Sequence, residues 1–298
     1  MRKHPVVWGV VLLIVIGFGF YTFFYKAGVQ SGGLKTKKFS FGEKIGVVNV
    51  HGVISDSLEI SQNLEEFGRD DSITAVVLRI DSPGGGVAAS QEIYDAVVQL
   101  KKKKKVVASM GSVAASGGLL IACAADKIVA NPGTITGSIS AIMQFANVEE
   151  LLKKIGVKSS VVKSGRYKDI GSPTREMTDE ERLIIQELVD DIFDQFVNVI
   201  VKDRNISRPQ VVAIADGRVF TGRKALELGL VDQLGDMGSA ARLAIELTGK
   251  SGEYDLVFPR KKRPSVFDYM LESALSSAVR TLKQTAEDAS GVSYLYHP

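Results

Sequence analysis

The chain has 298 residues, of which 45% are hydrophobic and 24% are charged, and its formal net charge is +3. These values are typical of a globular protein, and the small net charge excludes the strongly basic surface of a nucleic-acid-binding domain. The single cysteine, Cys123, excludes an internal disulfide and a cysteine-based metal cluster, and its apolar neighbours predict a place in the core.

An uncharged segment at residues 5–25 predicts one transmembrane helix. In helical form it would span about 31 Å, the thickness of a bilayer core. A cleaved signal peptide would need a shorter apolar region and a small-residue cleavage site, which favours an uncleaved anchor. Arg2 and Lys3 predict that residues 1–4 are cytoplasmic, although lysines after the span oppose that orientation. We therefore expect a single-pass protein of the cytoplasmic membrane, with a polar tether at 26–43 and an extracytoplasmic folded domain.

Strand and helix patterns alternate along the rest of the chain. Apolar, β-branched runs predict strands buried on both faces of a parallel sheet, and apolar residues at helical spacing predict the helices. The expected strands are 45–50, 73–80, 106–110, 127–130 and 159–162. The expected helices are 57–67, one that begins at 87, 116–124, 148–155, 179–202, 207–215, 222–228 and 237–247. This order predicts an α/β fold whose parallel strands are joined by helical crossovers.

Two parts of the C-terminal half carry further signals. Thr178 and Glu181 predict a capping box at the start of the helix 179–202. The folded domain is expected to cover 44–250 and to be followed by a tail at 251–298. The tail has a basic cluster and then an amphipathic pattern, which could lie on lipid, pack on a neighbouring subunit, or form a plain terminal helix or a disordered end.

One glycine-rich turn offers a nucleophile. The segment 111–118 (GSVAASGG) places Ser116 where a strand should turn into a helix, at the carboxyl edge of the sheet. The chain has only three histidines, at its two ends and near the first strand, so a Ser-His-Asp triad is not expected. A serine–lysine pair is the leading arrangement, with Lys168 as the base. Ser109 and Ser112 are rival nucleophiles on local grounds.

Peptide hydrolysis by a serine–lysine pair needs an uncharged lysine, and it needs hydrogen-bond donors for the oxyanion. The N–H groups of Gly85 and Gly117, on two strand-to-helix turns, would form a suitable oxyanion hole. Burial or nearby positive charge would lower the pKa of the Lys168 amine, whereas the carboxylate of Asp169 would oppose that change if it pointed the same way.

Together these segments resemble the signal peptide peptidase SppA family in its short, single-domain form. The resemblance is carried by 81–86 (DSPGGG), 110–118, 164–173 (SGRYKDIGSP), 178–182 and 217–222, and it covers roughly residues 44–250. This chain departs from the family at Leu119 and Leu120, where aromatic residues are common, and at Ser140, where glycine is common. These differences concern substrate preference more than catalysis.

The resemblance implies a ClpP/crotonase-like fold of repeated β-β-α units, with Ser116 as nucleophile and Lys168 as general base. It implies that Ser138 positions the lysine amine, that Gly85 and Gly117 bind the oxyanion, and that no metal, ATP or other cofactor takes part. The family degrades signal-peptide remnants in the membrane and forms dome-like homo-oligomers in which neighbouring subunits contribute to each site. An extended peptide substrate would pair with the backbone at Gly84, Gly86 and Val87.

Three other functions stay open. A crotonase-like acyl-CoA enzyme would share the glycine scaffold but should carry catalytic carboxylates. A related membrane protease would use the same dyad to cut the hydrophobic ends of stomatin-like proteins. A membrane scaffold without enzymatic activity would tolerate the loss of Ser116 or Lys168.

Overall fold

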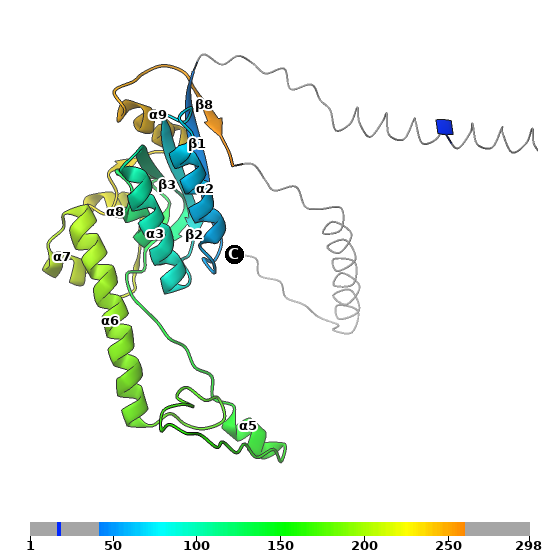
Figure 1. The fold of residues 1–298 in the computed structure, drawn as a ribbon. Coiled ribbons are helices and arrows are strands. Elements are labelled where there is room, and N and C mark those ends of the chain that lie inside the picture. The colour runs from blue at the N-terminus through cyan, green and yellow to red at the C-terminus, as the bar shows by residue number, and fades with distance from the viewer. Residues whose placement is uncertain (1–16, 19–41, 260–298) are drawn as a thin grey trace, which may run out of the picture.

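The computed structural model describes residues 17–18 and 42–259, and its centre is an eight-stranded sheet (Figure 1). The strands run in the order β6-β5-β3-β2-β1-β8, with β4 beside β3 and β7 beside β4. The strands of this sheet are β1 (Glu43–His51), β2 (Ala75–Ser82), β3 (Lys105–Ala115), β4 (Lys127–Ala130), β5 (Ile135–Gly137), β6 (Val219–Thr221), β7 (Gln233–Leu234) and β8 (Tyr254–Val257).

The strand pairings are parallel in this part of the chain, apart from the antiparallel pair of β5 and β6. The described helices are α2 (Leu58–Arg69), α3 (Val87–Lys101), α4 (Gly117–Cys123), α5 (Glu149–Lys154), α6 (Asp179–Arg204), α7 (Arg208–Val212), α8 (Gly222–Glu227) and α9 (Met237–Glu246). Strands that alternate with helices confirm the predicted α/β fold.

Helices cover both faces of the sheet, which explains why its central strands are continuously apolar. Successive side chains of a strand point to opposite faces. On β2, Val76 and Leu78 join the larger core with α2, α3, α4 and the C-terminal part of α6. Ala75 and Val77 join a second core under α9. Cys123 is fully buried in the larger core, as its apolar neighbours predict, and burial raises the pKa of its thiol to about 12.

The structure corrects two expectations about strands. Residues 111–115, expected to belong to the glycine-rich turn after the strand 106–110, are strand, because β3 continues past an irregularity opposite β2 and pairs with β5 up to Ala115. The strand expected at 159–162 is irregular chain, and Val162 is fully exposed there. Its β-branched residues meet no neighbouring strand, so local preference alone does not form one.

The eight expected helices are confirmed, with small differences at their ends. The capping box of α6 is present: the N–H of Glu181 donates to the Thr178 hydroxyl, and the Glu181 carboxylate accepts from the Thr178 N–H. The sheet gains four short strands that the sequence pattern did not indicate, β5 to β8. The last of them pairs with β1 and extends the sheet beyond residue 250.

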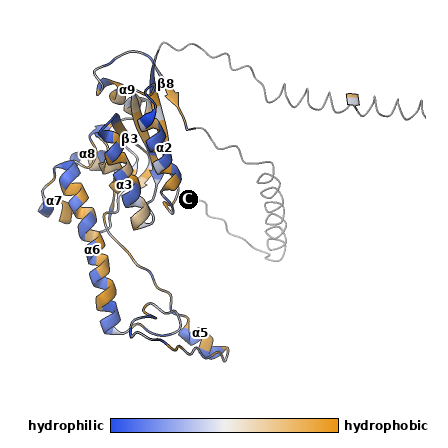
Figure 2. Cartoon of the chain, viewed as in Figure 1, coloured by the Kyte–Doolittle hydropathy of each residue, from blue (hydrophilic) through white to orange (hydrophobic). Residues whose placement is uncertain are grey.

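An arm made of residues 141–178 and the N-terminal half of α6 extends away from the sheet (Figure 1). Apolar residues of α6 that would normally be covered are exposed on it, and Leu183 is 65% exposed. Figure 2 shows these residues as orange stretches along α6 that no other element covers in this view. Exposed apolar surface of this extent is typical of a binding surface.

The predicted anchor at 5–25 lies almost entirely outside the described residues, as do the tether and the tail beyond residue 259. Within the residues that are described, no helix is both long and apolar enough to cross a bilayer.

Candidate active site

Ser116 lies between β3 and α4, at the N-cap of the helix. Its backbone has φ 53° and ψ −121°, a conformation that glycine adopts readily and other residues rarely do. Its N–H donates to the carbonyl of Gly137 (2.9 Å), and its carbonyl accepts from the N–H of Leu120 (3.0 Å). Backbone strain of this kind costs about 1–3 kcal/mol and is concentrated at functional sites. A sharp strand-to-helix turn also exposes a nucleophile at the edge of a sheet.

The turn between β2 and α3 packs directly against this serine. A Cβ atom on Gly84, whose φ is 103°, would lie 2.8 Å from the nitrogen of Gly117 and 2.8 Å from the Cβ of Ser116. A Cβ atom on Gly85 would lie 2.1 Å from the carbonyl oxygen of Ile54. Only glycine fits at these two positions, and its small size brings the two turns into contact.

This contact places two backbone donors next to the serine. Gly86 donates to the carbonyl of Ile54 (2.7 Å), and Ile54 donates to the carbonyl of Gly84 (3.0 Å). Since successive N–H groups of an extended segment point to opposite sides, the N–H of Gly85 points away from Ile54. The N–H of Gly117 belongs to the first turn of α4, where helices leave donors unpaired. Neither N–H has an acceptor among the described residues.

A small cavity of about 100 Å³ opens beside Ser116. The glycine turns form one wall, and apolar side chains of α4 and α6 form another. It is lined by Gly85, Val87, Ser90, Gln91, Ser116, Gly117, Leu120, Ser140, Ala141, Ile142, Ile192 and Phe196. No carboxylate is in this lining, and the cavity suits a small or apolar side chain.

The rival serines are less suited to react. Ser109 is almost completely buried within β3, and its hydroxyl accepts a hydrogen bond from the Nη1 of Arg79 (3.0 Å). Ser112 is exposed, but it lies in the middle of β3 and not at a helix N-terminus. Ser116 alone of the three combines the strained turn, the helix N-terminus and the cavity.

Ser138 follows Gly137, the residue whose carbonyl holds the Ser116 backbone. It also has a positive φ, 52°, and its N–H donates to the carbonyl of Arg218 (2.8 Å). The segment after β5 therefore runs beside the turn that carries Ser116. Ser138 was indicated by resemblance only, because β5 is too short to be recognised from its pattern.

Lys168 is placed apart from this cluster. It lies in a turn on the arm and is exposed, and its N–H donates to the carbonyl of Gly165 (3.2 Å). The arm extends away from the sheet (Figure 1), and Lys168 does not line the cavity beside Ser116. Its amine has no hydrogen-bond or ion-pair partner in the part of the chain that is described. One copy of the chain thus brings together Ser116, the two glycine donors and Ser138, but not Lys168.

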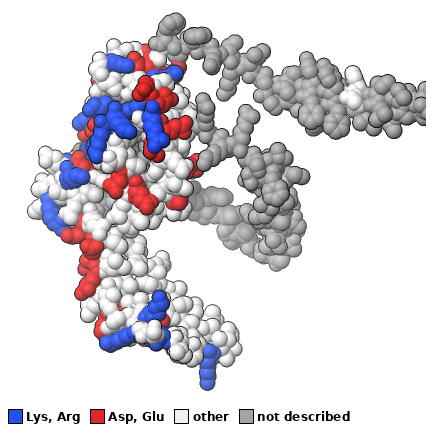
Figure 3. Space-filling model, viewed as in Figure 1, with Lys and Arg blue, Asp and Glu red and all other residues white. Residues whose placement is uncertain are grey.

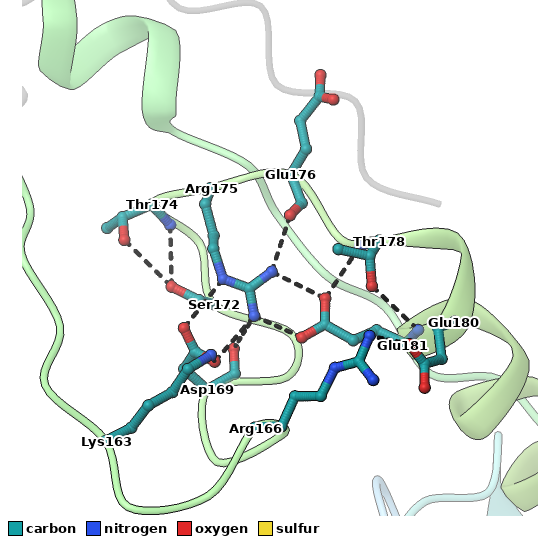
Figure 4. A network of polar contacts seen from close by, with 10 residues as sticks. All are labelled: Lys163, Arg166, Asp169, Ser172, Thr174, Arg175, Glu176, Thr178, Glu180 and Glu181. Carbon is teal, nitrogen blue, oxygen red and sulfur yellow. Dashed lines mark hydrogen bonds and ion pairs between the residues drawn. The ribbon is translucent and has the colours of Figure 1, made fainter.

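Next to Lys168 lies a network of charged groups that the sequence did not indicate (Figure 4). Arg175 donates to both oxygens of Asp169 and to both oxygens of Glu181. Arg175 and the Thr178 N–H lower the pKa of Glu181 to about 2, although burial opposes them. These residues are far enough apart in sequence that only the folded arm shows their contact.

Comparisons with known proteins agree with this geometry. The profile of peptidase family S49 matches residues 98–250, a range that contains both Ser116 and Lys168. The Clp protease profile matches residues 47–136, which begin within β1, end within β5 and include the glycine turns. A putative protease of Synechocystis sp. is 47% identical over 217 residues, 71% of this chain and 77% of that protein.

The chain belongs to peptidase family S49. It is a serine peptidase with a ClpP-like α/β domain. Among its S49 relatives, the putative signal peptide peptidase SppA of Enterococcus faecium is 39% identical, over 65% of this chain and 60% of that protein. Protease 4 of Haemophilus influenzae is 35% identical, over 72% of this chain and 37% of that protein. The match therefore spans less than two thirds of the length of these two relatives.

Proposed function

We propose that this S49 peptidase is a membrane-anchored endopeptidase that degrades signal-peptide remnants by means of Ser116 and Lys168. The observation that carries the proposal is the strained Ser116 at a helix N-terminus, beside the two unpaired donors of Gly85 and Gly117. Such a group of atoms supplies a nucleophile and an oxyanion hole for the hydrolysis of a peptide bond.

The reaction proceeds in two steps. A neutral Lys168 removes the proton of the Ser116 hydroxyl, and the oxygen attacks the peptide carbonyl. The N–H groups of Gly85 and Gly117 stabilise the negative oxygen, the amine is released with a proton from the lysine, and an acyl-enzyme forms. Water then attacks the ester with the same lysine as base and frees the serine.

The substrate would lie in extended form along the turn that begins α3. One edge of the segment from Gly84 to Gly86 is already bonded to Ile54, so its other edge is left for a peptide. Val87 is partly exposed and lines the cavity, which agrees with an apolar substrate side chain. The anchor predicted at 5–25 would confine the enzyme to the membrane plane where signal-peptide fragments are released.

The distance of the arm from Ser116 is explained if Lys168 serves a neighbouring copy. The arm and α6 expose Leu183, Ile184 and Leu188, and a homo-oligomer would cover them. On the face that Figure 3 shows, basic and acidic side chains are mixed over the body, while much of the arm is uncharged. We therefore place the dyad between protomers, with the serine from one copy and the lysine from the next.

The test uses the full-length protein in detergent, a fluorogenic apolar peptide and a serine-reactive probe. Ser116→Ala and Lys168→Ala should each abolish turnover and leave the thermal melting curve unchanged. The matched controls are Ser112→Ala, on the strand that leads to Ser116, and Lys158→Ala, on the arm that carries Lys168; both should keep activity. Equal turnover by the wild type and both dyad variants would refute the proposal.

Mixing the two inactive variants tests where the dyad forms. A lysine-deficient copy still carries Ser116 and a serine-deficient copy still carries Lys168, so about one quarter of the sites should regain activity after equal co-assembly. No recovery in verified mixed oligomers would place both residues in one protomer. Signal-peptide cores and hydrophobic protein C-termini, used as competing substrates, separate the proposal from the stomatin-type alternative.

A further inference from the structure

Arg175 joins the turn that carries Lys168 to the start of α6. Its Nε and Nη2 each donate to a carboxylate oxygen of Asp169 (2.9 Å and 2.9 Å). Its Nη1 and Nη2 donate to the two oxygens of Glu181 (2.8 Å and 2.5 Å). Glu181 is itself fixed by the capping box of α6. The planar guanidinium thus bridges two carboxylates, a geometry that lysine cannot reproduce.

The same arginine also holds the backbone next to Lys168. Its Nη2 donates to the carbonyl of Asp169 (3.2 Å). The turn is closed by hydrogen bonds from the N–H of Lys168 to the carbonyl of Gly165 and from the N–H of Ile170 to the carbonyl of Tyr167. A residue on each side of the lysine is therefore fixed, while the lysine side chain stays exposed and unpaired among the described residues.

The network also fixes the orientation of the carboxylate of Asp169, next to Lys168. Asp169 is the carboxylate closest in sequence to Lys168, and it is bonded to Arg175 and Lys163 instead. Arg175 first, and then Lys163, hold the pKa of Asp169 well below its usual range. The charged and titratable groups around this turn are Lys163, Arg166, Tyr167, Asp169, Arg175, Glu176, Glu180, Glu181 and Arg182.

An ion pair with Lys168 would be harmful to catalysis. A carboxylate within about 4–6 Å favours the charged form of an amine, and a charged amine cannot accept the serine proton. The side chain of Asp169 is only 14% exposed and its two oxygens are occupied. Arg175, which binds both oxygens, and Lys163, which binds Oδ1, thus hold this carboxylate away from the lysine.

We infer that Arg175 is a positioning residue for Lys168, which fixes the turn 165–172 on the start of α6 and keeps the Asp169 carboxylate off the lysine amine. This inference rests on the proposed role of Lys168 as general base. Arg175 does not touch the substrate or Ser116, and it acts through Asp169.

The test compares pH profiles of kcat/KM for the full-length enzyme with the fluorogenic peptide. In R175M the Oδ1 atom of Asp169 keeps Lys163, while its Oδ2 atom loses Arg175 and should pair with Lys168. The rising acidic limb should therefore move to higher pH by about 1 unit, and kcat/KM on that limb should fall about tenfold. Adding D169N to R175M removes the competing charge and should return the limb to its wild-type position. R166M breaks a different arginine pair, with Glu180, and should leave the limb in place.

The results distinguish a positioning role of Arg175 from a purely structural one. A limb that does not move in R175M, or that D169N does not restore, overturns the inference and leaves Arg175 a purely structural role. If R175M does not assemble, R175K replaces it: a lysine keeps one contact, and a smaller shift in the same direction is required. K168A separates this inference from the proposed function, because an active K168A would refute the dyad whatever Arg175 does.

Discussion

The substitution Gly85→Ala tests the proposed oxyanion hole directly, and the same substitution at Gly86 supplies the control. A Cβ atom on Gly85 would lie 2.1 Å from the carbonyl oxygen of Ile54 and 2.6 Å from the Ile54 nitrogen. Both are backbone atoms, so the clash cannot be relieved by rotation of a side chain. A Cβ atom on Gly86 would lie 3.6 Å from that oxygen, which is ordinary contact.

The backbone displacement caused by this clash can be compared with the distances at which oxyanion donors work. Cβ contacts under 3.0 Å are essentially not seen, so the Gly85 turn and Ile54 must separate by about 0.9 Å. Oxyanion donors work at about 2.7–3.1 Å, and the loss of one costs about 10²–10³ in kcat, or roughly 2.7–4 kcal/mol. We therefore expect Gly85→Ala to lower kcat by at least about 10², while KM changes less.

The assay is steady-state hydrolysis of the apolar fluorogenic peptide, with melting curves to confirm that each variant is folded. Gly86→Ala should keep kcat within about threefold of the wild type, because its backbone at φ −59° and ψ 134° suits alanine. A folded Gly85→Ala enzyme with wild-type kcat would refute the reasoning. It would show that the Gly85 N–H does not stabilise the transition state.

Two further predictions concern stability. Ser116→Gly should be inactive yet more stable than Ser116→Ala by about 1 kcal/mol in urea unfolding, because glycine relieves the strain at φ 53°; equal stability would argue against strain there. Burial raises the pKa of Asp232, but Arg204 and the Ile128 N–H outweigh it, so the pKa lies below its ordinary value. The ionised carboxylate therefore stabilises the fold above about pH 3.9, and this contribution is lost as the pH falls through the folded-state pKa. Asp232→Asn should cost about 1–3 kcal/mol at pH 7 and progressively less below pH 4, whereas a pH-independent difference would contradict the assignment.

The sequence by itself determined the α/β class, the helices and the strand-to-helix turn at Ser116. Each of these depends on local signals: β-branched runs buried on both faces, the capping box of Thr178 and Glu181, and glycines that alone fit beside Ser116. The strands β5, β6 and β7 have only two or three residues each and carry too little pattern to be predicted, and β8 is a strand because it pairs with β1. The strand predicted at 159–162 (SSVV) was wrong for a different reason, because a strand needs a partner strand and the described part of the arm offers none.

Only the tertiary structure decided where the charges of the site point. The sequence left open whether Asp169 would face Lys168. In the fold, Asp169 is bound by Arg175, six residues further along the chain. It likewise sets Lys168 on an arm outside the cavity of Ser116, although both lie within the S49 match. These placements depend on how helices and turns pack against one another, and the order of neighbouring residues does not specify that packing.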